Sequence, residues 1–215
     1  GGLMGHAQLM ELEFESNLCS ELSERGWLYE ADEVDGNTAV AGWDIALALV
    51  PQDVLHWLAT QYPDEYEKAV PADLTGTPQA TAENKLLTHL TKELAKTTRM
   101  DPTTGYPVGG LLGVLRKGFS YAQVGRPTAK FGAMMAFPPA NPQLTEVAEA
   151  AAGVRLRILR QVRFDTTTNE TLDVVLTANG VPVVTMELKT DNTQTINHAI
   201  RQYKQDRKPG RNRPL

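Results

Sequence analysis

The first half of the chain alternates helical apolar patterns with turn-forming residues. Residues 7–25 are predicted to form a helix that stops at Gly26, because a glycine directly after an apolar stripe commonly ends a helix. The apolar stripe of this helix consists of Leu9, Leu12, Leu18 and Leu22. A short strand is predicted over residues 27–29, and a second helix begins at Pro51 and is interrupted at Pro63.

The middle of the chain is rich in glycine and proline. A helix is predicted over residues 82–96, where leucines recur at helical spacing. Irregular loops are predicted over residues 97–142, with one strand within them at residues 131–137. A short helix over residues 144–152 then ends at Gly153.

The last third has the pattern of a β-sheet followed by a helix. Residues 154–164 alternate and suit an extended segment, and the runs 172–176 and 181–188 are rich in β-branched residues. These two runs flank an Asn-Gly dipeptide at positions 179–180, the strongest short hairpin signal. Residues 196–203 repeat apolar side chains at i, i+3, i+4 and i+7 and predict an amphipathic helix on the sheet. The fold class is therefore predicted to be α/β.

Charge and composition narrow the functional classes. The formal net charge is −5, but residues 153–215 hold 11 Lys and Arg against 6 Asp and Glu. This asymmetry suggests contact with nucleic acid, and a solvated basic face explains it equally well. No apolar run approaches the roughly 18 residues of a membrane span, and no signal-peptide pattern opens the chain. The lone Cys19 excludes an internal disulfide and is expected to be a buried thiol, which favours a cytoplasmic location.

Three charged residues in the predicted hairpin suggest metal-dependent chemistry. Glu187 and Lys189 share one face of the second strand, because side chains alternate along a strand. Asp173 interrupts the apolar run of the first strand, where a carboxylate is costly unless it is paired or binds a metal. Surface strands often carry Glu-x-Lys, so the triplet alone is weak evidence. The whole arrangement, with its Asn-Gly turn and following helix, is far more specific.

The hairpin needs an irregularity if the two carboxylates are to act together. With a strict two-residue turn, Asp173 stands opposite Met186 and Glu187 points to the other face. A type I turn followed by a glycine bulge shifts the register and places Asp173 and Glu187 on one face. The candidate site therefore predicts a bulge in this hairpin.

The residue types suit hydrolysis of a phosphodiester. That reaction needs a hard cation to polarise a phosphoryl oxygen and lower the pKa of a bound water. Mg²⁺ commonly takes one or two carboxylates, which Asp173 and Glu187 supply, and the backbone carbonyl of Leu188 is a further candidate oxygen ligand. Lys189 is expected to orient the attacking water or to offset charge that develops on the phosphorane.

Several motifs together resemble a known family. The stretch 155–207, with LDVVL, NGVPVVTMELKT and AIRQYKQDR, resembles the nuclease domain of type I restriction enzyme R subunits, which belongs to the PD-(D/E)XK superfamily. FESNLCSELSERGW resembles the opening helix of that domain, and GGLLGVLRKGFS and FPPANPQL resemble the middle of one R-subunit subgroup. The resemblance implies a restriction endonuclease-like fold, with a central mixed β-sheet flanked by helices. It implies one endonuclease domain over residues 1–215 with a catalytic core at about 154–207.

The resemblance also implies roles for individual residues. Asp173 matches the metal-binding aspartate of the family, Glu187 its second metal ligand and Lys189 its catalytic lysine. Glu15, on the opening helix, matches an acidic residue often found near such metal sites, and an ordinary solvated helix glutamate explains it equally well.

The family's Q-x-x-x-Y motif is incomplete in this chain. Tyr203 is present, but Ala199 stands where the family has glutamine. Gln202 and Gln194 are the candidate substitutes, and Gln202 and Tyr203 are therefore counted among the candidate site residues.

The implied ligands and partners are Mg²⁺, double-stranded DNA and the modification and specificity subunits of a restriction complex. The resemblance implies that the polypeptide continues into ATP-driven translocase domains, so that ATP binds there and not in these residues. Basic side chains are expected to hold backbone phosphates without reading bases. They are Arg155, Arg157, Arg160, Lys204 and Arg207. Two other hypotheses are a catalytically idle DNA-holding or docking module, and a free-standing nuclease of the same superfamily.

Overall fold

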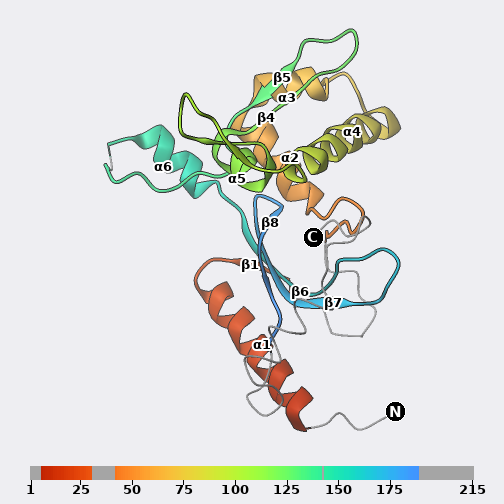
Figure 1. Cartoon of the computed structure of the whole chain (residues 1–215), viewed down its shortest axis with the longest axis vertical. Helices are drawn as coiled ribbons and strands as arrows, with labels where there is room; N and C mark the ends of the chain where they lie inside the picture. The colour runs from red at the N-terminus through yellow and green to blue at the C-terminus, as the bar shows by residue number, and fades with distance from the viewer. Residues whose placement is uncertain (1–5, 31–41, 142, 189–215) are drawn as a thin grey trace.

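The structure is a computed structural model that describes residues 6–30, 42–141 and 143–188 (Figure 1). Its described residues form six helices and eight strands in a mixed α/β arrangement. The helices are α1 (His6–Glu24), α2 (Pro51–Gln61), α3 (Pro63–Ala69), α4 (Gly76–Leu94), α5 (Gly110–Lys117) and α6 (Thr145–Ala152). The strands are β1 (Leu28–Tyr29), β2 (Arg99–Met100), β3 (Pro107–Val108), β4 (Phe119–Tyr121), β5 (Ala129–Phe131), β6 (Leu156–Arg163), β7 (Thr171–Ala178) and β8 (Val181–Met186).

The largest sheet has four strands in the order β1-β6-β7-β8. β1 runs parallel to β6, whereas the β6–β7 and β7–β8 pairs are antiparallel, so the sheet is mixed as expected. The pairs β2–β3 and β4–β5 form two small antiparallel sheets. In Figure 1, α1 lies along one side of the large sheet, whereas α2 to α5 and the small sheets gather beyond the β7–β8 turn.

The two faces of the large sheet belong to different apolar clusters. On the α1 side, Cys19 packs with Ile158 of β6 and Val174 of β7, and its thiol is buried as expected. On the opposite side, a second cluster contains residues of β6 and β7 together with Val50. A third and larger cluster, centred on Trp57 of α2, holds α2 to α5 and β4–β5 together. None of the described helices has the length and apolarity needed to cross a bilayer.

Most predicted elements within the described residues occur close to their expected limits, although α4 begins six residues before the expected start at residue 82, and the middle of the chain differs. The helix expected over residues 196–203 lies outside the described residues. The strand expected over residues 131–137 is wrong, because β5 ends at Phe131. Beyond it, the carbonyl oxygen of Ala133 accepts hydrogen bonds from the side chains of Trp57 (3.1 Å) and Tyr62 (2.7 Å) instead of from a neighbouring strand. The sequence analysis also missed α5, which lies in the region expected to be loop.

Candidate functional site: a hairpin with two carboxylates

The β7–β8 hairpin contains the predicted irregularity. Asn179 and Gly180 have φ values of 47° and 81°, the signature of a tight two-residue turn of type I′. Leu176 pairs with Val184, but Thr177 pairs with Pro182, so Val183 is an extra residue in β8. The bulge is confirmed, although it lies beside Pro182 and not at the glycine as we expected. Proline has no N–H for the ladder, so it favours a break in strand pairing at this point.

The bulge sets the register of the two acidic residues. Beyond it Val174 pairs with Met186, and the same register continued by one residue places Glu187 opposite Asp173. The N–H of Leu188 donates a hydrogen bond of 2.6 Å to Oδ2 of Asp173. The end of β8 is thus held against the half-buried Asp173, while Glu187 is exposed. Without the bulge, Asp173 would face Met186.

The pKa of Asp173 reflects its acidic surroundings. Burial raises the pKa of this carboxyl, and the charges of Glu187 and Glu11 raise it as well. Hydrogen bonds from the Leu188 N–H and from the side chain of Gln161 act in the opposite direction. Asp173 therefore lies where negative charge is concentrated and only partly offset, which is a setting that a bound cation would stabilise.

Glu15 is buried against the same sheet. Its side chain is 2% exposed, although it lies on α1 among polar residues. Nε of Arg160 donates to Oε1 of Glu15 at 2.5 Å, and Nε2 of Gln161 donates to Oε2 at 2.9 Å. The alternative that Glu15 is a solvated helix residue is therefore wrong. Leu9, expected in the apolar stripe of α1, is instead 52% exposed, because the helix turns the face with Glu15 to the sheet.

The alternation of β6 breaks beside Glu15. Leu159 and Val162 belong to one apolar cluster although they are three residues apart. A regular strand would place them on opposite faces. Between them, both Arg160 and Gln161 contact Glu15 on the α1 side. The left-handed backbone of Gln161, with φ of 49°, allows two consecutive side chains to reach the same carboxylate.

The neighbouring strand β7 shows the matching break. Leu172 and Val175 both belong to the cluster on the far side of the sheet, again three residues apart. Between them, Asp173 lies close enough to Gln161 for that amide to lower the pKa of its carboxyl, and Val174 packs in the α1-side cluster. Because pairing of β6 with β7 keeps the same register on both sides of this point, Gln161 and Asp173 are cross-strand neighbours.

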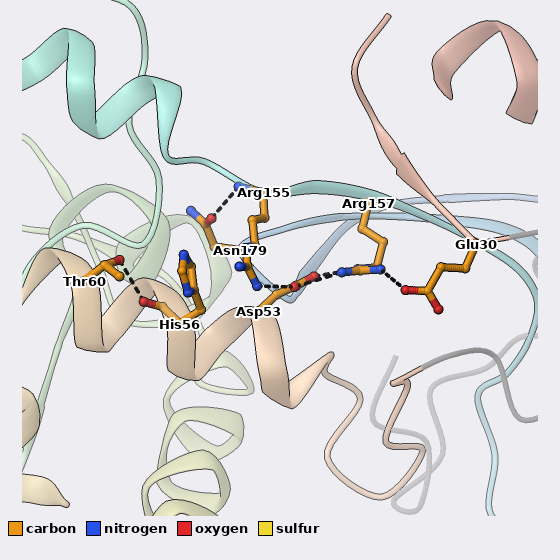
Figure 2. Close-up of polar contacts among 7 residues, drawn as sticks. All are labelled: Glu30, Asp53, His56, Thr60, Arg155, Arg157 and Asn179. Carbon is orange, nitrogen blue, oxygen red and sulfur yellow. Dashed lines mark hydrogen bonds and ion pairs between the residues drawn. The ribbon is translucent and has the colours of Figure 1, made fainter. Parts of the chain in front are cut away.

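Three arginines in and just before β6, Arg155, Arg157 and Arg160, have carboxylate partners. In Figure 2, Arg157 points to Asp53 and Glu30, and Arg155 also reaches Asp53. Asp53 is 0% exposed and accepts hydrogen bonds from Nε (2.6 Å) and Nη2 (3.0 Å) of Arg157. Arg160 is held by Glu15 in the same way. These contacts favour structural roles for Arg157 and Arg160 rather than the contacts with DNA phosphates that the sequence suggested.

Several expected site residues lie outside the described residues. They are Lys189, Gln194, Gln202, Tyr203, Lys204 and Arg207. Within the described part of the chain, no group of three or more His, Cys, Asp or Glu side chains is arranged to hold a metal ion. The described part of the site therefore consists of Asp173, Glu187 and Leu188, with Glu15 joined to Asp173 through Gln161.

Gln161 and Asp53 were not predicted from the sequence. A signal for Gln161 was present, because the consecutive polar residues Arg160 and Gln161 interrupt the alternation between Leu159 and Val162. No interruption of a sequence pattern marks Asp53. An acidic residue in the first turn of a helix is common at the surface, and only its contact with Arg157, 104 residues away in the sequence, shows its burial.

These features define a mixed α/β protein in which an irregular hairpin brings two acidic residues together at a strand end. Residues 148–214 match the family described as the type I restriction enzyme R protein N terminus, which confirms the resemblance for this part of the chain. The matched segment includes β6, β7, β8 and the Asp173, Glu187 and Lys189 positions. Neither the curated proteins nor the solved structures contain a match to the chain.

Proposed function

We propose that this chain is the Mg²⁺-dependent nuclease domain of a type I restriction enzyme R subunit, with a PD-(D/E)XK fold, and that it cuts double-stranded DNA. The observation that carries the proposal is the bulged hairpin register, which sets Glu187 opposite Asp173 just before Lys189. The family match over residues 148–214 supports it independently.

The donor set fits Mg²⁺. Asp173 and Glu187 provide two carboxylates, and the backbone carbonyl of Leu188 follows directly. Burial raises the pKa of Asp173, and the nearby carboxylates add to this effect, so a cation would relieve the unfavourable charge. The bound ion would polarise a phosphoryl oxygen and make a water molecule more acidic. Lys189 would orient the attacking water or offset the negative charge that develops on the phosphate.

Binding of DNA is assigned to Arg155, Lys204 and Arg207, of which only Arg155 lies within the described residues. Arg155 is partly exposed and makes only one long contact, of 3.3 Å, with Asp53. Together with Lys204 and Arg207 it would contact backbone phosphates without reading bases. Gln202 and Tyr203 are further proposed members of the site.

In this proposal the 215 residues belong to a longer polypeptide. Residues 1–215 would form one endonuclease domain with a core at about 154–207, and ATP-driven translocase domains would follow. That polypeptide would assemble with modification and specificity subunits in the cytoplasm. ATP would then bind only outside these 215 residues.

The test is DNA cleavage by the intact complex carrying Lys189→Ala, with Mg²⁺ present and ATP hydrolysis followed in parallel. Loss of one general acid–base or charge-stabilising group typically costs about 10²–10⁴-fold in rate, so cleavage should nearly disappear while ATP hydrolysis persists. Lys85→Ala on α4 is the matched control and should leave both activities unchanged. Cleavage by Lys189→Ala at the wild-type rate would overturn the proposal.

A further inference from the structure

Gln161 occupies an unfavourable backbone conformation at the centre of a strand. Its φ of 49° lies in the left-handed region, which side chains other than glycine and asparagine rarely adopt. Such conformations persist where surrounding contacts determine them, and they concentrate at functional sites. Arg160 pairs with Val174 and Val162 pairs with Leu172, so Gln161 lies across from Asp173 between these two pairs, and the unusual backbone lies beside the candidate metal ligand.

The side-chain amide of Gln161 makes hydrogen bonds to both α1 and β7. Nε2 donates to Oε2 of Glu15 at 2.9 Å, and Asp173 on the neighbouring strand is close enough for the amide to lower the pKa of its carboxyl. Oε1 of Gln161 accepts a hydrogen bond of 3.1 Å from the hydroxyl of Thr171. An amide has two N–H donors and one carbonyl acceptor, so it can contact Glu15 and Thr171 and still present an N–H to Asp173. The amide therefore joins a carboxylate on α1 to a carboxylate on β7.

The amide of Gln161 is uncharged, so it does not compete with a cation for Asp173. An arginine or lysine bridging Glu15 and Asp173 would neutralise them and would compete with a cation for Asp173. An amide orients both carboxylates and adds no positive charge, so Asp173 keeps its charge for a metal ion. Hydrogen-bond partners of this kind commonly tune metal sites, and their loss costs about 10–100-fold in metal affinity.

We propose that Gln161 is a positioning residue of the nuclease site, which orients Asp173 for the metal ion by tying it to Glu15. This inference rests on the proposed function, because it takes Asp173 to be a metal ligand. The alternative is that Gln161 only fastens α1 to the sheet. The two alternatives differ in whether metal affinity depends on the amide when the fold is intact.

The variant Gln161→Gly distinguishes positioning of Asp173 from fastening of α1 to the sheet. Glycine adopts φ of 49° without strain, so this variant removes the amide and relieves the backbone at the same time. The experiment measures Mn²⁺ binding to the full-length R subunit without nucleotide, from the loss of the free Mn²⁺ signal in electron paramagnetic resonance. It also measures the Mg²⁺ concentration that gives half-maximal DNA cleavage by the intact complex, and the melting temperature of each variant.

We expect Gln161→Gly to melt close to the wild type and to lose about 10–100-fold in Mn²⁺ affinity at one site. The Mg²⁺ requirement for cleavage should rise by a similar factor. Gln79→Ala is the matched control, because it removes an amide that also donates to a carboxylate, Glu83, on the remote helix α4. This control should bind Mn²⁺ like the wild type.

Wild-type Mn²⁺ affinity in Gln161→Gly would overturn the inference. Asp173→Asn, measured beside it, distinguishes failure of the inference from failure of the proposed function. If Asp173→Asn loses the Mn²⁺ site and Gln161→Gly keeps it, the inference on Gln161 fails and the proposed function stands. If both variants bind Mn²⁺ and cleave DNA like the wild type, the proposed function itself fails.

Discussion

The pKa of Asp173 depends on the groups that surround its carboxyl. It is half-buried, it lies near the acidic side chains of Glu187 and Glu11, and only hydrogen bonds from Leu188 and Gln161 oppose the resulting rise of its pKa. A carboxylate in such a setting reduces the stability of the metal-free protein. This is the usual arrangement at sites where function and stability compete.

Asp173→Asn should therefore stabilise the metal-free chain. Relief of like-charge contacts across strands is worth roughly 0.2–1 kcal/mol, which corresponds to a rise in melting temperature of up to about 3 °C in a domain of this size. Mg²⁺ should raise the melting temperature of the wild type and should have little effect on the variant. Thermal unfolding with and without Mg²⁺ measures both effects.

The exposed loop residue Asp73 provides the control for this measurement. Asp73→Asn should leave both the melting temperature and its response to Mg²⁺ close to the wild type. An equal response of Asp173→Asn and the wild type to Mg²⁺ would exclude Asp173 as a ligand.

At the scale of elements, the β7–β8 turn also supports α2. The carbonyl of Gly180 accepts a hydrogen bond of 2.9 Å from the N–H of Val50, directly before α2 begins. A Cβ on Gly180 would lie 2.4 Å from the carbonyl oxygen of Val50, so only glycine fits. The hairpin that carries the candidate site is thus joined to the start of the helix that carries Asp53.

Gly180→Ala should destabilise the protein by more than the cost of placing alanine in a left-handed backbone conformation. A left-handed alanine costs roughly 1–2 kcal/mol, and the overlap with Val50 adds about 1–3 kcal/mol. Gly26→Ala is the matched control, because Gly26 has φ of 92° but a Cβ added to it would meet no atom within 4 Å. Urea denaturation of both variants compares the two costs. Equal losses of unfolding free energy would contradict the close approach at Gly180.

At the scale of the whole molecule, a buried ion pair links the helical part to the large sheet. Asp53 of α2 and Arg157 of β6 are joined by two hydrogen bonds, and Asp53 is completely buried (Figure 2). Removing one partner of a buried pair leaves the other without compensation, whereas replacing both by apolar residues is often tolerated. The pair therefore fixes the position of α2 on β6. Substitution of either partner alone is expected to lower the unfolding free energy strongly.

Arg157→Met should lower the unfolding free energy by about 3–5 kcal/mol, because it leaves Asp53 with only the longer contact to Arg155. The double variant Asp53→Leu with Arg157→Met should recover most of this loss. Chemical denaturation of Arg157→Met, Asp53→Leu and the double variant gives the coupling energy between the two residues.

Lys68→Met provides the surface comparison. Lys68 and Glu65 form a partly exposed pair within α3, and loss of such a surface pair costs less than about 1 kcal/mol. A loss in Arg157→Met as small as that in Lys68→Met would mean that the buried pair does not hold the two parts together.

Local patterns determined much of the hairpin. The Asn-Gly dipeptide specified the turn, because few residues accept the positive φ of both central positions. The requirement that Asp173 and Glu187 act together specified a bulge, since side chains alternate strictly along regular strands. The position of that bulge at Val183 was not predicted, because the sequence analysis attributed it to the glycine and gave no weight to the missing N–H of Pro182.

Only the tertiary structure decided the surroundings of the site. The burial of Glu15 depends on Arg160, 145 residues away in the sequence, and the roles of Arg157 and Asp53 depend on a contact that is similarly distant. Periodicity reports which residues share a face of one element, but it does not report which faces meet. The sequence by itself therefore determined the hairpin and its acidic residues. The folded chain decided that Gln161, in a conformation no local pattern requires, joins Glu15 to Asp173.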